Sequence, residues 1–181
     1  EKCPIIPFVL ENIVEQIAEI ETAAIWSKVI VGNRDLPIGR LIEVLDNADW
    51  VSQGRKHLRE DGICPFCQKQ TITDELKNQL DAFFSGEYEQ DVSLIKQFIG
   101  QYSSYTDELL SRIKTLRTSL GSYPAAGIEA SKIDSIIELL NGYFSKNKAE
   151  MLIKEKEPGR IISLTETAAT TSSMKQLVIN G

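Results

Sequence analysis

The sequence predicts a mostly α-helical protein, built as an antiparallel helical bundle or a coiled-coil-like hairpin arm. Apolar residues recur every three or four positions through most of the chain, which is the spacing of amphipathic helices. Clusters of Gly, Pro and polar residues separate these periodic stretches. A hydrophobic content of 42% over 181 residues is enough for a folded core, and we expect one elongated helical domain spanning 1–181.

The first expected helix covers about 9–31 and ends at the turn cluster 32–37. The second covers about 38–60 with the same apolar spacing. Gly54 lies inside it and costs about 1 kcal/mol relative to Ala in a helix, so it predicts close packing or a kink there.

The third helix begins after a polar loop at 62–72, with Thr73 or Asp74 as its N-cap. It either continues to Leu120 or breaks near Ser85-Gly86. An unbroken helix would extend about 70 Å at 1.5 Å per residue, which is the length of an arm. Residues 38–120 are thus expected to form a helical hairpin with the loop at its tip.

The last third of the chain predicts a return helix over 128–157, preceded by a turn at 122–127 and ended by Pro158-Gly159. The short β-branched stretch 160–165 is the best candidate for a strand. Residues 167–179 indicate a polar linker or a further helix.

Charge and composition limit the classes of function that this sequence can have. The net charge of −6 argues against a general polyanion-binding surface. No apolar run is long enough to span a membrane, and no signal-peptide pattern is visible. Three cysteines favour a reducing compartment, so we expect the cytoplasm. Because the sequence starts at Glu1 and stops on an apolar stretch, we also expect it to be a fragment of a larger chain.

Two of the cysteines lie in the loop, as Cys64-Pro65-Phe66-Cys67. With two residues between them, both sulfurs can face one metal ion, which is half of a structural zinc site. Pro65 restricts the backbone of such a turn. Since closed zinc sites have four ligands, the others would come from Cys3, from His57 or from a second copy of the chain.

Two alternatives for the pair remain open. A dithiol oxidoreductase would use Cys64 as a nucleophile of lowered pKa at a helix N-terminus, after a strand. The preceding residues 56–62 instead indicate a helix end with a Gly cap. The third interpretation is a reduced pair packed in a loop without metal.

The sequence contains few other motifs that indicate binding or catalysis. The basic run Arg55-Lys56-His57-Leu58-Arg59 predicts a solvated helix face, or a contact with nucleic acid or a partner at the tip. The sequence has no Gly-x-x-x-x-Gly-Lys-Ser/Thr loop, no Ser nucleophile elbow and no His-Glu-x-x-His motif. We therefore expect no enzymatic activity from this segment, and no catalytic or nucleotide-binding residue is assigned.

The combination of Asp49-Trp50-Val51-x-x-Gly54 with Cys64-Pro65-Phe66-Cys67-Gln68 resembles the middle region of bacterial P-loop ATPases of the anticodon-nuclease (PrrC-like) type. The segments 154–158 and 161–164 are also similar, so the resemblance runs from about Ala24 to the end. It implies a helical insertion in an ABC-like ATPase head, with 160–181 leading back towards that head. ATP binding and hydrolysis would belong to the parent, some members of which couple them to RNA cleavage in phage defence.

The Cys-Pro-x-Cys sequence also resembles the zinc hook of double-strand-break-repair ATPases. In those proteins two hairpin tips share one zinc ion. The resemblance implies that Cys64 and Cys67 each donate a thiolate and that a homodimer forms through the tip.

Overall fold

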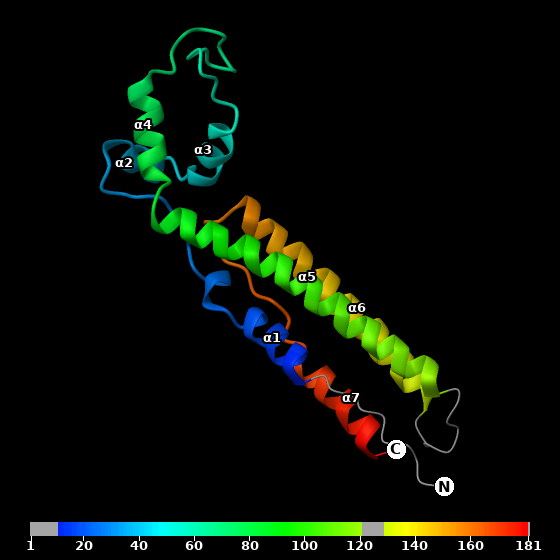
Figure 1. The fold of residues 1–181 in the computed structure, drawn as a ribbon. Coiled ribbons are helices and arrows are strands. Elements are labelled where there is room, and N and C mark those ends of the chain that lie inside the picture. The colour runs from blue at the N-terminus through cyan, green and yellow to red at the C-terminus, as the bar shows by residue number, and fades with distance from the viewer. Residues whose placement is uncertain (1–10, 121–128, 181) are drawn as a thin grey trace. The chain divides into compact units, whose positions relative to one another are not determined.

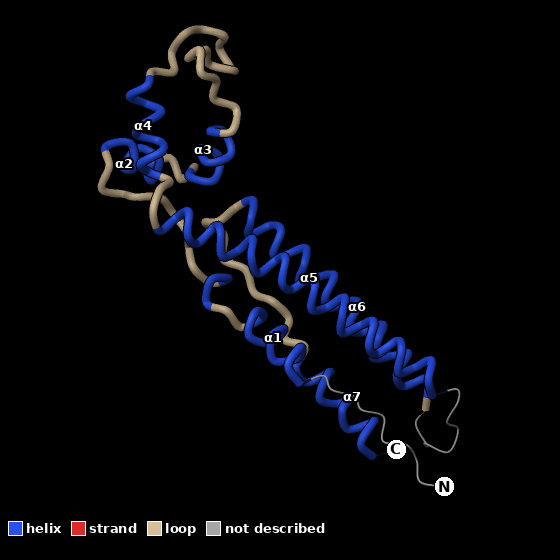
Figure 2. The backbone as a smooth tube through the Cα atoms, viewed as in Figure 1, coloured by secondary structure: helices blue, strands red, loops and turns tan. Residues whose placement is uncertain are grey.

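The computed structural model describes residues 11–120 and 129–180. These residues form seven α-helices and one short 3₁₀ helix, with no strand among them (Figures 1 and 2). The predicted mostly α-helical class is confirmed.

The chain divides into two compact units, and α5 (Glu87–Leu120) and α6 (Ala130–Lys156) contribute residues to both. We call residues 1–24, 97–151 and 163–181 the bundle unit, and residues 25–96 and 152–162 the loop unit. Each is described by itself.

The bundle unit combines α1 (Glu11–Glu21) and α7 (Ala168–Asn180) with the adjacent stretches of α5 and α6. Here α5 and α6 run antiparallel, side by side (Figure 1), joined by ion pairs of 3.0 Å between Lys148 and Asp107 and 2.8 Å between Arg117 and Asp134. Apolar side chains at helical spacing are buried where the helices of this unit pack together. The buried set includes Ile13, Ile17, Ile20, Tyr102, Leu109, Ile113, Leu116, Ile133, Leu140, Phe144, Met151 and Met174.

The loop unit contains α2 (Pro37–Val44), α3 (Ala48–Arg55) and α4 (Asp74–Phe83). Its core is rich in aromatic side chains. The rings of Phe83 and Phe84 meet edge-on with centroids 4.7 Å apart, and Tyr88 continues the row at 4.8 Å from Phe84. Such edge contacts add to the stabilisation that the buried area already provides.

The first helix is shorter than expected. It ends at Glu21, and a 3₁₀ turn at Ala24–Trp26 leads into an irregular segment instead of continuing to 31. Ile25, Trp26 and Ile30 are nonetheless buried, and the Ile30 N–H donates to the Pro158 carbonyl at 3.3 Å. Apolar spacing alone cannot separate a helix from an irregular segment whose side chains are buried, which is why this prediction was wrong.

The single helix expected over 38–60 is wrong as well. Two short helices, α2 and α3, replace it, and the turn between them holds Asp46 at a φ of 48°. Of the close packing or kink expected at Gly54, the close packing is not found, because a Cβ placed there would meet nothing within 4 Å; instead α3 ends at the next residue, Arg55. The apolar residues keep the same spacing through both helices, so the sequence pattern does not reveal the turn between them.

Of the two alternatives for the third helix, the structure has the break near Ser85-Gly86, since α4 ends at Phe83 and α5 begins at Glu87. Gly86 takes a φ of 67°, which favours glycine and ends the first of the two helices. The return helix is confirmed as α6 over Ala130–Lys156, and residues 168–180 form the further helix α7.

The strand expected at 160–165 does not form. The Ile162 N–H donates to the Trp26 carbonyl at 2.9 Å, but no ladder of such bonds accompanies it in the described residues. A β-branched stretch without a neighbouring extended segment has no partner for a sheet.

The Thr73 cap of α4 provides a first testable prediction. Its side-chain oxygen accepts from the Leu76 N–H at 3.2 Å, as predicted for the N-cap. Thr73→Ala should therefore lower the free energy of unfolding by about 1 kcal/mol in chemical denaturation. Thr73→Ser, which retains the acceptor, should be close to wild type; an equal loss in both variants would contradict the capping role.

Candidate metal centre

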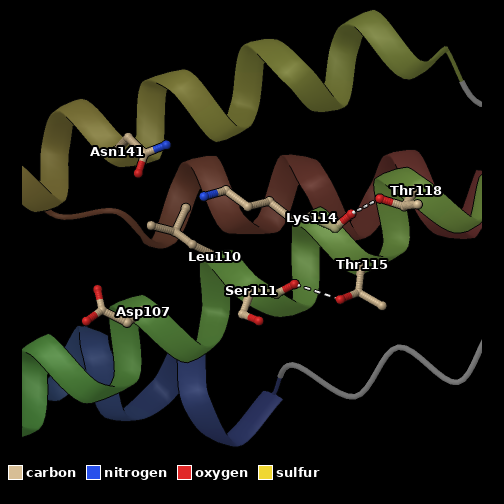
Figure 3. A pocket seen from close by; sticks show the side chains of 7 residues that line it. All are labelled: Asp107, Leu110, Ser111, Lys114, Thr115, Thr118 and Asn141. Atoms are coloured by element: carbon tan, nitrogen blue, oxygen red, sulfur yellow. Dashed lines mark hydrogen bonds between the residues drawn. The ribbon is translucent and has the colours of Figure 1, made fainter.

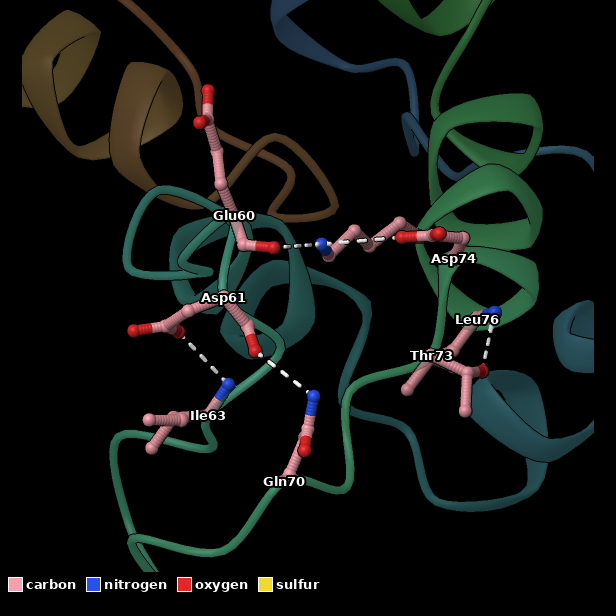
Figure 4. Close-up of polar contacts among 8 residues, drawn as sticks. Glu60, Asp61, Ile63, Gln70, Thr73, Asp74 and Leu76 are labelled. Atoms are coloured by element: carbon pink, nitrogen blue, oxygen red, sulfur yellow. Dashed lines mark hydrogen bonds and ion pairs between the residues drawn. The ribbon is translucent and has the colours of Figure 1, made fainter.

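The cysteine loop joins the end of α3 to the start of α4 and is closed at its base by polar contacts (Figure 4). The Asp61 carboxylate accepts from the Ile63 N–H at 2.9 Å, and the Gln70 side chain donates to the Asp61 carbonyl at 3.4 Å. The Lys77 ammonium, from α4, donates to the Glu60 carbonyl at 3.2 Å. These bonds fix the two ends of the loop close together.

Above this base the backbone makes a tight turn. Ile63 and Gln70 form a single antiparallel bridge, and the Cys64 N–H donates to the Lys69 carbonyl at 2.8 Å. The Gln68 N–H returns to the Cys64 carbonyl at 2.9 Å, with Gln68 in the left-handed region at a φ of 57°. The turn therefore places both cysteines within four residues of backbone that is held by hydrogen bonds.

The backbone N–H groups of Cys67 and Phe66 lower the pKa of the Cys64 thiol, because they favour its thiolate form. Cys67 is exposed, and its sulfur lies 3.9 Å from the Thr71 hydroxyl oxygen. Backbone donors directed at a sulfur stabilise the thiolate, which is the form that binds metal. The donor set thus suits a zinc ion as two of its four ligands.

The turn does not gather further ligands from the described part of the chain. Among residues 11–120 and 129–180, no three His, Cys, Asp or Glu side chains lie in a group that could hold a metal ion. His57 is exposed in the segment before the loop and is not brought into such a group. Cys3 lies outside the described residues. The structure therefore brings the sequence-predicted pair Cys64 and Cys67 together in one turn, without a third candidate ligand from the described residues.

The features required of a dithiol oxidoreductase are only partly found. No strand precedes the loop, and α4 begins at Asp74, seven residues after Cys67, so neither sulfur caps that helix. The pKa of Cys64 is lowered, but by the hydrogen bonds of its own turn.

Two exposed aromatic side chains flank the cysteines. Phe66 lies between them in sequence and is 78% exposed, while Trp50 of α3 is 60% exposed. Their ring centroids are 6.1 Å apart. The helical spacing of the two tryptophans predicts core positions for both; Trp26 is buried, but Trp50 is not, so for Trp50 that prediction is wrong.

The basic run is largely neutralised within the loop unit. Arg55 pairs with Asp81 at 2.6 Å and lies over the Phe84 ring, and Arg59 pairs with Asp61 at 3.1 Å. An open groove of about 460 Å³ lies beside them. Its lining includes both Arg55 and its partner Asp81. This arrangement favours the solvated-face interpretation.

The bundle unit has an open groove of about 520 Å³ along α5, with Asn141 contributed by α6 (Figure 3). The hydroxyls of Thr115 and Thr118 point back to carbonyls of their own helix at 3.0 Å, and Asp107 is paired with Lys148. Its polar side chains are thus largely engaged in contacts within the unit, and it is a weaker site candidate than the cysteine turn.

The bundle unit contains a buried carboxylate that was not predicted from the sequence. Glu21 accepts from the Tyr102 hydroxyl at 2.7 Å and from the Thr167 N–H at 2.8 Å, and the Asn147 amide lies at 3.3 Å. Burial raises the pKa of Glu21, and these hydrogen bonds lower it in part. The available signal was Asn147 itself, a polar residue at the spacing of the core residues Phe144 and Met151.

A buried lysine in the loop unit was also missed. The Lys154 side chain is fully buried, and its ammonium donates to the carbonyls of Lys28, Pro158 and Arg160. Desolvation lowers the pKa of Lys154. Like Asn147, Lys154 follows the apolar spacing of α6.

Two of the segments that carried the family resemblance, 49–54 and 154–158, meet near this lysine. Asp49 accepts from the Gly159 N–H at 3.2 Å, and the Gln53 amide donates to the Lys156 carbonyl at 2.9 Å. Burial raises the pKa of the Asp49 carboxyl. These residues connect α3 to the end of α6 within the loop unit.

The described residues form a helical fold in which a tight turn brings Cys64 and Cys67 together. A family model described as an AAA domain matches residues 5–180, and the chain belongs to this family, which is related to the P-loop ATPases. The comparison with curated proteins found no match, nor did the comparison with solved structures. None of the helices in the described residues has the length and apolar character needed to cross a bilayer.

Proposed function

We propose that this chain is a non-catalytic structural and interaction module of an ATPase-family protein, in which Cys64 and Cys67 provide half of a zinc site that a second copy completes. The hydrogen-bonded turn at 64–68 carries this proposal, since it presents two sulfurs with backbone donors already directed at one of them. Membership of the AAA domain family supports the ATPase context.

In this proposal ATP is bound by the parent ATPase, because the present sequence contains no Walker loop. The finer assignment, a helical insertion of the anticodon-nuclease type working in the cytoplasm, rests on the Asp49–Gly54 and Cys64–Gln68 motifs. Zinc would have a structural role: it would cross-link two chains and would not act on a substrate.

A second copy is the simplest source of the missing ligands. A closed structural zinc site has four ligands, and the described residues supply two of them at the turn. Both cysteines lie at least partly open to solvent, so a second loop can reach them. The oxidoreductase alternative and a nucleic-acid contact at Arg55–Arg59 have less support, because no strand or helix N-terminus serves the thiols and carboxylates neutralise the arginines.

The test is metal content together with native mass, measured on protein purified under reducing conditions. We expect about one zinc per two chains and a dimeric mass, as required by a four-thiolate site shared between copies. The double substitution Cys64→Ser, Cys67→Ser should abolish both, as should a strong chelator. The matched controls are Cys3→Ser and His57→Ala, which should leave the zinc content and the mass unchanged.

Two results would contradict this proposal. One zinc per monomer, reduced by Cys3→Ser or His57→Ala, would show that a single chain completes the site. A metal-free monomer unaffected by loss of Cys64 and Cys67 would show that the turn has no metal-binding role.

A further inference from the structure

The exposed aromatic pair at the cysteine turn has no role in the metal half-site itself. Among the described residues, Phe66 and Trp50 are the most exposed aromatic side chains, with exposed fractions of 78% and 60%. Large exposed apolar side chains that lie together are typical of an interaction site. Their position beside Cys64 and Cys67 limits what can cover them.

A shared metal would bring two turns into direct contact. With zinc–sulfur bonds of about 2.3 Å in a tetrahedral arrangement, sulfurs from the two copies would lie roughly 3.8 Å apart. Phe66 lies between the two cysteines in sequence, and its side chain is 78% exposed. A side chain in this position cannot remain solvated when a second turn approaches the same metal ion.

The charges at the turn are compatible with two identical copies. No Asp, Glu, Lys or Arg occurs between Asp61 and Lys69, so the approaching segments carry no like charges except the thiolates. Four thiolates and one Zn²⁺ leave two negative charges, which Lys69 from each copy can offset. Lys69 belongs to the same turn, since its carbonyl accepts from the Cys64 N–H.

We propose that Phe66 and Trp50 form an aromatic contact between two copies of the chain, packed against the same residues of the second copy around the shared metal. This inference rests on the proposed zinc-mediated pairing and names the surface that stabilises it. In a two-fold arrangement the same patch serves both partners, so each side chain is used twice. The metal fixes the register, and the aromatic rings supply most of the buried apolar area.

The experiment measures the dimer dissociation constant of the full 181-residue chain by sedimentation equilibrium in zinc. Phe66→Ser and Trp50→Ser should each raise this constant by about 10- to 100-fold, the range that corresponds to losing one buried aromatic side chain. The matched control is Val44→Ser, which removes a 75% exposed apolar side chain on α2 of the same unit. It should leave the constant unchanged.

Fluorescence gives an independent readout, because the chain has two tryptophans and Trp26 is already buried. Adding zinc to the wild type should shift the Trp50 emission to shorter wavelength at concentrations where the dimer forms. Phe66→Ser should bind the same zinc per dimer with a smaller shift.

The possible results distinguish a failure of the aromatic contact from a failure of the proposed zinc-mediated pairing. Zinc-dependent dimers with unchanged affinity in Phe66→Ser and Trp50→Ser would overturn the aromatic contact and leave the shared zinc site standing. Wild-type protein that forms no zinc-dependent dimer would overturn both.

Discussion

Replacing Glu21 by alanine is expected to lower the free energy of unfolding by about 3 to 4 kcal/mol, because several buried donors lose their acceptor at once. The carboxylate receives the Tyr102 hydroxyl and the Thr167 N–H, and it also accepts from the Thr167 hydroxyl and the Asn147 amide. These donors come from α5, from α6 and from the segment that leads into α7. Without Glu21 the Tyr102 hydroxyl and the Thr167 donors would lose this buried acceptor, while the Asn147 amide would keep its bonds to the Tyr102 oxygen and the Thr165 carbonyl.

The measurement is chemical denaturation combined with hydrogen exchange of the bundle unit. Exchange in α1 and α7 should accelerate in Glu21→Ala. The control Glu19→Ala removes an exposed carboxylate from the same helix and should change stability by less than about 0.5 kcal/mol. Equal effects of the two substitutions would show that the Glu21 hydrogen bonds contribute nothing specific.

The same residue predicts a pH dependence. Burial raises the pKa of Glu21 above its ordinary value of 4.5, so the folded protein holds this proton more tightly than the unfolded chain. Stability from this group is fully present below pH 4.5 and is lost as the pH rises through the folded pKa. The wild type should therefore gain stability relative to Glu21→Gln as the pH is lowered from 7 towards 4.5. A constant difference between the two across this range would contradict the raised pKa.

Replacing Lys154 by alanine is expected to have a comparable or larger effect, about 3 to 5 kcal/mol. The ammonium is fully buried and donates to three carbonyls, two of which, Pro158 and Arg160, follow the end of α6. The third belongs to Lys28, so the side chain fastens the segment after the 3₁₀ turn to the end of α6. Its loss would remove the lysine donor from the Lys28 and Arg160 carbonyls, while the Pro158 carbonyl would keep its bond from the Ile30 N–H.

Lys154→Met separates hydrogen bonding from packing, because methionine fills much of the same space but donates nothing. It should still lower stability by about 2 kcal/mol or more. Lys146→Met, an exposed lysine on the same helix, is the matched control. Tryptophan fluorescence is a suitable measurement because both tryptophans belong to the loop unit. A Lys154→Met variant as stable as the control would show that the carbonyls are satisfied without the lysine.

The sequence by itself determined the helical class and the nearness of Cys64 to Cys67, and it limited the cap of α4 to Thr73 or Asp74 and a possible helix break to Ser85-Gly86. Each depends on interactions between residues that are close in sequence, such as periodic apolar spacing, a cap or a two-residue turn. Gly86 favours a positive φ because it has no side chain, and Thr73 favours the N-cap position because its hydroxyl oxygen accepts a backbone N–H.

Only the tertiary structure decided the rest. The split of 38–60 into two helices and the irregular path after Glu21 follow from which buried surfaces were available, and apolar spacing does not encode that choice. Glu21 and Lys154 acquire their partners from residues more than 100 positions away, at Thr167 and Lys28. A buried charge persists only where distant segments supply its hydrogen bonds, so its role could not be found from the residues that surround it in sequence.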